Sequence, residues 1–341
     1  VFLNDFVTFS GAASLGGTIT AAVLNKEYQV VSVVDASNYT ITSAVAANAS
    51  DTGNGGGSTV GTYQINTGLD SSASGSGWGA GPYSRGTWGS AANVVIPGAQ
   101  LRLWSMDNFG EDLIANVRGG GIYYWDTSAG ASARAVDITS LSGNNQPQAA
   151  NIVLVSERDR HVIAFGCDPQ GDPGVLDPLT IRFSSQESVT DWQARADNTA
   201  GELRIGTGSE IITAVQTKQQ VVVFTDRSVS AMQFIGAPFT FGLTEVSTNT
   251  SIASQNAAVA FGDVVYWMGD EVFYMYDGNV KLIPCPVEEY IFDNLNLDQR
   301  AKVTAGVNSK FNEIWWFYPS LNNNNNDSYV VYNYAEKSWY Y

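Results

Sequence analysis

The chain has 341 residues, of which 44% are hydrophobic and 12% aromatic, and this composition is typical of globular proteins rather than disordered ones. Its 33 acidic residues outnumber the 17 Lys and Arg residues, which gives a formal net charge of −16 at pH 7. Such a charge repels phosphate backbones and argues against a sequence-reading DNA-binding protein.

Residues 1–65 are predicted to form a small antiparallel β module. Apolar and polar residues alternate with a period of two over residues 6–9, 27–34 and 38–42, as expected for half-buried strands. Turn-forming Gly, Ser, Asp and Asn residues separate these stretches. The module is therefore expected to have strands with one buried face.

Residues 66–98 are predicted to be a linker because Gly, Ser and Asn dominate the segment and leave too little apolar surface for a core. Its aromatic residues are the exception. Trp78, Tyr83 and Trp88 are costly to expose to water, so we expect these rings to pack on a neighbouring domain or subunit.

Residues 99–341 are predicted to consist of short strands separated by turns, because hardly any segment has a helical period. The exception is 287–300, where a turn or two of helix is expected. The expected strands are residues 101–104, 113–117, 121–126, 152–155, 161–165, 180–183, 211–215, 221–225, 229–234, 264–268, 272–276, 280–283, 303–307, 314–318, 329–334 and 339–341.

A loose repeat of aromatic strand, tight turn and second strand recurs at 221–234, 264–283 and 314–341. Repeated meanders of about 40 residues indicate radial blades more than a sandwich. The predicted fold is therefore all-β: a β-propeller-like array of antiparallel meanders over 99–341, with the small N-terminal module. The chain begins at Val1 without an initiator Met and ends at Tyr341 inside an expected strand, so we expect a piece of a longer polypeptide and an incomplete propeller.

Residues able to bind metals or act as nucleophiles are few. His161 is the single histidine, so a histidine-based triad or a multi-histidine metal site is excluded within the chain, and a structural or solvent-exposed histidine is expected. Cys167 and Cys285 lack the spacing of a zinc site or a disulfide framework and are expected to be buried apolar residues. Gly119 to Gly121 lacks the lysine of a phosphate-binding loop. No cofactor or metal site is predicted.

Carboxylates are the plentiful catalytic residue type, and five of them gather in a loop region rich in Pro and Gly: Asp168, Asp172, Asp177, Glu187 and Asp191. A protonated and an ionised carboxyl can flank a glycosidic bond, and aromatic rims can stack on sugars. A carbohydrate-active or carbohydrate-binding propeller is therefore an alternative function. Loop carboxylates more commonly cap and solvate turns, so no catalytic residue is predicted and the chain is expected not to be an enzyme.

Two features of the last 30 residues concern surface and core. The run from Asn322 to Asn326 is expected to be the exposed tip of a hairpin. Trp315 and Trp316 are adjacent in a predicted strand and must point to opposite faces, so one of them at most lies in any one layer of the core.

Six motifs mark the second half of the chain: residues 181–192 (IRFSSQESVTDW), 201–205 (GELRI), 224–229 (FTDRSV), 232–239 (MQFIGAPF), 265–269 (VYWMG) and 312–318 (NEIWWFY). With them, the stretch from about 179 to 341 resembles the tail nozzle, or tail tubular, proteins of short-tailed bacteriophages. Residues 6–55 resemble a small β module inserted in such tail proteins.

The resemblance implies a virion protein of the phage tail without catalytic residues or cofactors. It implies a homo-oligomeric ring, expected to be a hexamer, stacked beneath the portal and adaptor proteins and flanked by tail fibres or spikes. Genomic DNA would pass through this ring during ejection without sequence-specific binding. The chain is shorter than most nozzle proteins, in agreement with the expected incompleteness.

The net charge suits a conduit, because an acidic protein offers few cations to displace the counterions of DNA. The same charge opposes ring formation, so contacts between subunits must be apolar, hydrogen-bonded or locally charge-paired. Heterologous contacts that close by rotation would form such a ring. A further hypothesis is that the chain is an adhesion or scaffold β protein of another envelope. The identity of its binding partners would distinguish this hypothesis from a tail protein.

Overall fold

The computed structural model describes residues 6–35, 37–50, 56–63, 101–131, 133–236 and 238–341. The predicted linker, with Trp78, Tyr83 and Trp88, lies outside the described residues. The chain divides into two compact units, Val1–Gly68 and Leu69–Tyr341. Each unit has its own sheets and its own core.

The first unit is built on one antiparallel sheet with the strand order β3-β2-β1-β4. Its alternating residues Val7, Tyr28 and Val30 are buried on one face, as the period of two predicts. The Asn25 side chain bonds both the N–H and the carbonyl of Ala12 and so fixes the loop over the sheet. The elements are β1 (Phe6–Ser10), α1 (Ala21–Leu24), β2 (Glu27–Asp35), β3 (Asn38–Ile41) and β4 (Val60–Tyr63).

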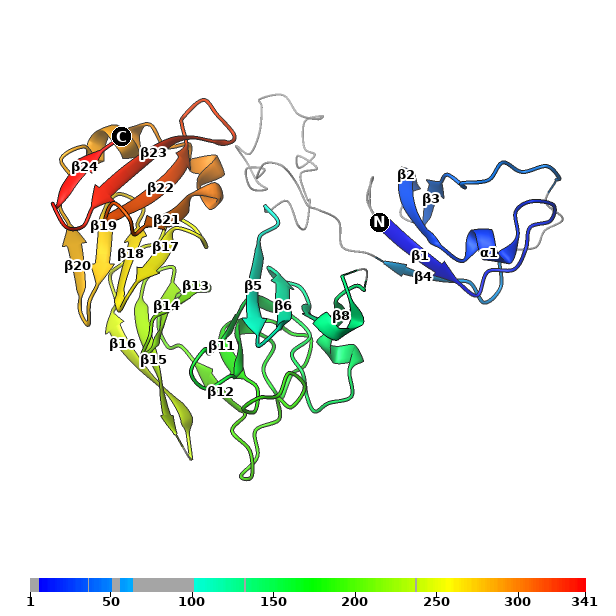
Figure 1. Cartoon of the computed structure of the whole chain (residues 1–341), viewed down its shortest axis with the longest axis horizontal. Coiled ribbons are helices and arrows are strands. Elements are labelled where there is room, and N and C mark those ends of the chain that lie inside the picture. The colour runs from blue at the N-terminus through cyan, green and yellow to red at the C-terminus, as the bar shows by residue number, and fades with distance from the viewer. Residues whose placement is uncertain (1–5, 36, 51–55, 64–100, 132, 237) are drawn as a thin grey trace, which may run out of the picture. The chain divides into compact units, whose positions relative to one another are not determined.

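The second unit contains five of the six four-stranded antiparallel sheets of the described chain, and each is a simple meander of consecutive strands (Figure 1). We call them blades 1 to 5. Blade 1 is β5 (Trp104–Phe109), β6 (Asp112–Val117), β7 (Ile122–Trp125) and β8 (Val136–Asp137); blade 2 is β9 (Ala150–Val155), β10 (Val162–Cys167), β11 (Asp177–Phe183) and β12 (Gly201–Arg204); blade 3 is β13 (Ile211–Gln216), β14 (Val221–Thr225), β15 (Val229–Gly236) and β16 (Thr240–Ser247); blade 4 is β17 (Ala258–Phe261), β18 (Val264–Met268), β19 (Phe273–Tyr276) and β20 (Val280–Ile283); blade 5 is β21 (Thr304–Asn308), β22 (Glu313–Pro319), β23 (Asn326–Asn333) and β24 (Ser338–Tyr340).

The first strands of successive blades pack on one another: β5 on β9, β9 on β13, β13 on β17, and β17 on β21. Side chains of β5 bond the free edge of β9, since Ser105 Oγ accepts from Val153 N at 3.0 Å and Asp107 Oδ2 from Val155 N at 2.8 Å. The first strands thus line the inside of the array and the later strands lie further out. This is the arrangement of a propeller, and the predicted all-β, propeller-like class is confirmed.

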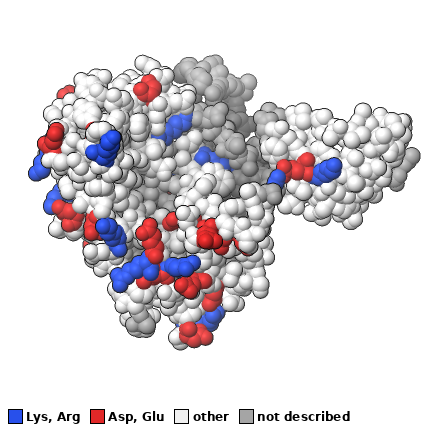
Figure 2. Space-filling model, in the orientation of Figure 1, with Lys and Arg blue, Asp and Glu red and all other residues white. Residues whose placement is uncertain are grey.

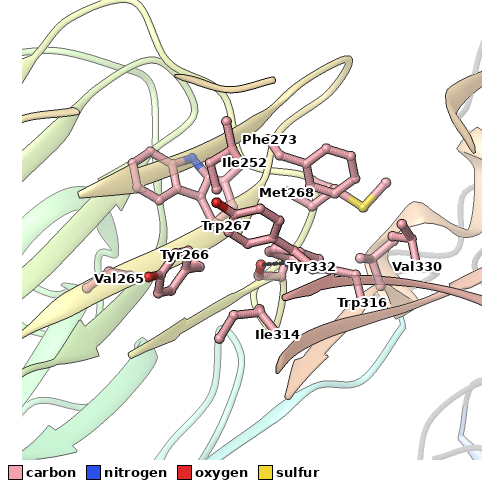
Figure 3. Packing of buried hydrophobic residues seen from close by; sticks show 14 of the residues in the cluster. Ile252, Val265, Tyr266, Trp267, Met268, Phe273, Ile314, Trp316, Val330 and Tyr332 are labelled. Carbon is pink, nitrogen blue, oxygen red and sulfur yellow. Dashed lines mark hydrogen bonds between the residues drawn. The ribbon is translucent and has the colours of Figure 1, made fainter. Parts of the chain in front are cut away.

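Neighbouring blades are held together by alternating aromatic residues, most densely between blades 4 and 5 (Figure 3). Trp316 on β22 is fully buried, its ring centroid lies 4.9 Å from that of Phe273, and its Nε1 donates to the carbonyl of Ala257 at 3.0 Å. Its neighbour Trp315 points to the other face and stacks on Phe317. The prediction that these two tryptophans face opposite sides is confirmed.

The connection between blades 4 and 5 contains the predicted helical turns, as α2 (Glu288–Asp293) and the 3-10 helix η3 (Leu297–Lys302). This connection also fixes the predicted asparagine tip. Asn296 Nδ2 donates to the carbonyl of Asn323 at 2.8 Å, and Lys302 Nζ donates to Asn325 Oδ1 at 3.2 Å. The tip is exposed, as predicted. Two further 3-10 turns, η1 (Thr127–Ala129) and η2 (Ile138–Ser140), flank β8.

The structure corrects several strand predictions. Residues 101–103 are not in a strand. The strand β5 begins at Trp104 and pairs with β6 through the turn at Gly110, which has a φ of 71°. Five strands were not predicted from the sequence: β4, β8, β12, β16 and β17. Each of them lies at an edge of its sheet. An edge strand packs on fewer neighbours, so its sequence carries a weaker apolar alternation.

We expect Trp316→Ala to lower the free energy of unfolding of the second unit by about 3–5 kcal/mol, because it removes a fully buried indole from the junction of two blades. Trp315→Ala, the matched control on the other face, should cost less than half as much. Urea unfolding followed by far-ultraviolet circular dichroism measures both. Equal losses would contradict the assignment of the two faces.

Candidate functional site

A cavity of about 340 Å³ lies where the first strands of all five blades meet, and we call it the central cavity. Its walls combine aliphatic residues with neutral polar groups, and no charged residue is among them. Gln255 is buried there and its Oε1 has no hydrogen-bond partner among the described residues. The lining residues are Trp104, Ser105, Met106, Ile152, Val153, Leu154, Thr213, Ala214, Val215, Gln255, Asn256, Ala258, Thr304 and Ala305.

The size of the central cavity limits what it can hold. About 340 Å³ falls within the range of about 300–1,000 Å³ that is typical of small-ligand pockets. It is far too small for a nucleic acid duplex. A channel for DNA would therefore have to be formed between several copies of the chain and not through one array.

The buried carboxylate Asp168 has a structural role. One of its oxygens accepts from Gln148 N at 2.8 Å and from Ala149 N at 3.0 Å, and the other lies 3.9 Å from Nη1 of the equally buried Arg182. Arg182 also donates to the carbonyl oxygen of Asp168 at 3.1 Å. These bonds hold the connection into blade 2 and leave no free acid for catalysis.

Three of the other four candidate carboxylates lie beside arginine side chains. Asp177 pairs with Arg204 at 2.7 Å, and this hydrogen bond lowers the pKa of Asp177, whereas a general acid needs a raised pKa. Asp191 pairs with Arg195 at 2.8 Å, and Glu187 lies 3.9 Å from Arg160. Asp172 is exposed.

The structure does not bring Asp177 and Glu187 together. Asp177 begins β11 and Glu187 follows its end, and seven extended residues span about 20 Å. Paired glycosidase carboxyls lie about 5–10 Å apart. Although Asp177 and Glu187 are close in sequence, they are therefore too far apart in space to act as such a pair.

His161 is buried at the junction of blades 2 and 3, so of the two expected positions, structural and solvent-exposed, it has the structural one. Its ring packs against Phe183, Phe234 and Phe241, with the closest ring centroid, that of Phe241, at 5.2 Å. Its Nε2 lies 3.1 Å from Thr199 Oγ1. Burial lowers the pKa of His161 to about 4, so the ring is neutral at physiological pH.

The two cysteines differ. Cys167 is fully buried in β10, as predicted, whereas Cys285 lies between Pro284 and Pro286 after β20 and is only half-buried, so the prediction of burial is wrong for Cys285. Both thiols are free. Burial raises the pKa of each, to about 11 for Cys285, so neither is an activated nucleophile.

A groove of about 800 Å³ separates β12 of blade 2 from the long β15–β16 hairpin of blade 3, and we call it the blade 2–3 groove. Its apolar side includes Ile235 and Phe239, which are 57% and 72% exposed, and its polar side includes Arg195 and Arg204. Figure 2 shows acidic and basic side chains gathered over the region of β11 and β12. Sequence reasoning missed the exposed hairpin tip, although the apolar residues on either side of the sequence Gly-Ala-Pro were a usable signal.

Within the described ranges, no group of three His, Cys, Asp or Glu side chains is placed to hold a metal ion. None of the helices among the described residues is long and apolar enough to span a membrane.

Comparison with protein families gave no match, and comparison with curated proteins gave none either. Among solved structures, Hsv2 of Kluyvelomyces marxianus is similar at a TM-score of 0.38 and 8% identity, with 68% of this chain and 60% of that chain covered. The extracellular domain of the putative one-component system BT4673 of B. thetaiotaomicron is similar at 0.42 and 12%, with 70% and 27% covered. A fungal alcohol oxidase of the AA5 family, solved with copper, is similar at 0.42 and 8%, with 70% and 52% covered.

The chain thus spans between 27% and 60% of the length of these three structures. Similarities this distant assign neither a function nor a fold. The fold assignment rests on the sheet order and the packing of the first strands.

We expect His161→Gln to flatten the pH dependence of stability below about pH 6.5. Because burial lowers the pKa of His161 to about 4, the unfolded chain takes up the proton first as the pH falls. The stability contributed by the neutral ring is complete above about pH 6.5 and is lost toward pH 4, by at most about 1.4 kcal/mol per pH unit.

The measurement is the free energy of unfolding of both proteins between pH 7 and pH 5. Carboxylates common to the two proteins cancel in the difference. Identical pH dependence in the wild type and in the variant would show that His161 is not buried in its neutral form.

Proposed function

We propose that this chain is a structural subunit of a bacteriophage tail, a wall element of the oligomeric nozzle ring through which DNA leaves the particle. The observation that carries the proposal is exposed aromatic and aliphatic surface on rigid sheets of an acidic chain. Exposed patches of this kind mark contacts with other proteins. The motif resemblance supplies the identity of the assembly.

The exposed large apolar residues of the second unit include three groups. Blade 1 exposes Trp104 and Met106, the β15–β16 hairpin exposes Ile235 and Phe239, and blade 5 exposes Phe317, Tyr329 and Tyr340. These residues lie on strands or tight hairpins that are fixed by hydrogen bonding. Rigid apolar surfaces bind at a lower entropic cost than flexible loops.

The charge distribution supports a passive role toward DNA. The chain carries −16, and the walls of the central cavity carry no charge. Phosphate binding depends on Lys and Arg residues that release counterions, and such residues are few here. In the proposed ring, DNA would pass between copies and would be repelled by their surface.

The partners and the location follow from the resemblance. The proposed ring is a homo-oligomer, expected to be a hexamer, with tail adaptor proteins above it and fibres or spikes alongside. A closed ring of identical subunits requires heterologous contacts, in which two different surfaces of each copy meet.

A carbohydrate-binding or carbohydrate-active propeller is the second candidate, favoured by one observation. The blade 2–3 groove places an exposed ring, that of Phe239, opposite Arg195 and Glu202. Aromatic faces and charged groups of this kind occur in sugar-binding sites. A glycan array, together with turnover assays of Asp191→Asn and Glu187→Gln, tests this candidate, and a purified chain that cleaves a glycan would overturn the structural proposal.

We expect the chain to sediment with tail assemblies and to be labelled by specific antibodies at the distal end of the tail. The physical reason is that its apolar surfaces are covered only in the assembly. Sedimentation of disrupted particles followed by immunoblotting measures this. A chain recovered only outside the particle fraction would contradict the proposal.

We expect no retention of duplex DNA by the purified chain in an electrophoretic shift assay at low salt. A protein that neutralised several phosphates would show affinity that falls steeply with salt, with a slope of about −0.9 per phosphate contacted. Measurable binding with such a slope would mean that a basic surface of the chain binds DNA despite the acidic net charge, and would contradict the expectation.

A further inference from the structure

In each of the two end blades of the array, one face is not packed against another blade of the described residues. In blades 2, 3 and 4, both faces pack on neighbouring blades through the three buried clusters of the unit. Blade 5 packs one face on blade 4, and blade 1 packs one face on blade 2. Among the described strands, β5 and β21 make no contact comparable to those between successive first strands.

The uncovered face of blade 5 is aromatic. Residues Ile314 and Trp316 of β22 point into the core with blade 4, so Trp315 and Phe317 point the other way. The register places Tyr329 opposite Phe317 on β23, and Trp315 contacts both rings at centroid distances of 5.1 and 5.7 Å. Phe317 and Tyr329 remain 40% and 42% exposed, as does Tyr340 of β24 at 40%.

The uncovered face of blade 1 has the same character. Ile114 and Ile122 are fully buried toward blade 2, so the alternate residues face away from it. Trp104 and Met106 of β5 lie on that far face, where they also border the central cavity, and are 37% and 59% exposed. The register of β6 and β7 adds Tyr123 and Trp125 to the same face, both half-buried.

Carboxylates on the two faces are held by neutral donors or by a helical turn. Glu313 of blade 5 accepts from Trp315 Nε1 at 2.9 Å, from Asn308 Nδ2 at 3.1 Å and from the Tyr340 hydroxyl. Asp137 of blade 1 caps η2 by accepting from Thr139 N at 2.8 Å. A chain with a net charge of −16 can associate with itself most easily through faces whose few charges are already hydrogen-bonded.

Four junctions inside the chain already join one blade to the next through opposite faces, in the order blade 1 to blade 5. Blade 5 has free the face that in blades 1 to 4 packs on the following blade. Blade 1 has free the face that in blades 2 to 5 packs on the preceding blade. A second copy therefore offers the surface that continues the series.

We propose that the uncovered face of blade 5 packs on the uncovered face of blade 1 of the next copy, so that the contact between subunits repeats the blade-to-blade junctions within the chain. This inference rests on the proposed ring and names its subunit contact. The contact is heterologous, and a rotation repeated from copy to copy closes it into a ring.

Cross-linking tests the pairing of the two faces. In a Cys285→Ser background, Met106→Cys and Tyr329→Cys are made as separate chains and mixed with a flexible bis-maleimide. The mixture should give a linked dimer, and each variant alone should give several-fold less. A chain carrying both substitutions should give a ladder of linked oligomers. Phe239→Cys in place of Tyr329→Cys is the matched control and should not link to Met106→Cys.

The opposite results are equally clear. A doubly substituted chain that links only within itself would mean that blades 1 and 5 close on each other. A chain that stays monomeric at its highest soluble concentration would also contradict the contact. Phe317→Glu with Tyr329→Glu should abolish the oligomer in size-exclusion chromatography, whereas Phe239→Glu should leave it intact.

Failure of this contact and failure of the proposed function are distinguishable. If the chain is found in the tail but the two faces do not cross-link, the contact is wrong and the function stands. If the two faces cross-link in solution but the chain is absent from tail particles, the contact stands and the function is wrong.

Discussion

Face-to-face packing of twisted four-stranded sheets is the interaction on which the second unit depends. Because side chains alternate between the two faces of a strand, each blade has two apolar faces and needs a neighbour on both. Trp267 and Trp316 are fully buried by this packing, and Phe224 and Phe273 lie against them. The same requirement explains why the ends of the series expose Met106 and Phe317.

The strands with strong apolar alternation could be predicted from the sequence, because two packed faces demand it. Residues 264–268 and 314–318 match β18 and β22 to within two residues at each end. The edge strands β12 and β16 could not be predicted, since β12 has only four residues, Gly242 interrupts the pattern of β16, and one side of each strand is unpaired. Their existence depends on hydrogen bonding to strands that are already formed.

The residues of the candidate site were harder to predict from the sequence than the strands. A cluster of carboxylates in one loop region gave no information on distance, and β11 places Asp177 and Glu187 at its opposite ends. The ion pair that occupies Asp177 involves Arg204, which is 27 residues away along the chain. The central cavity draws on first strands from all five blades, so no local pattern predicts its lining. For His161, the sequence could exclude a multi-histidine site because no other histidine exists in the chain, but it could not distinguish a buried position from an exposed one.

The proposed function combines two properties that act at different ranges. In the proposed ring, the net charge of −16 would act over about a Debye length of 8 Å and would repel phosphates from the surface. Aromatic contacts act only on touching and can hold copies together in spite of that repulsion. A conduit for a polyanion needs both the charge repulsion and the aromatic contacts. In the described chain these features lie in different places: hydrogen-bonded carboxylates lie near the apolar faces, and charged pairs gather near β11 and β12.

The central claim is that the chain works as a wall element among copies of itself. Electron microscopy of the assembled protein, with class averages viewed down the particle axis, tests it most directly. The account predicts a rotationally symmetric ring around an opening wider than the cavity of one array, with neighbouring copies joined blade to blade. Single arrays without symmetric neighbours, in preparations at the concentration found in particles, would contradict it.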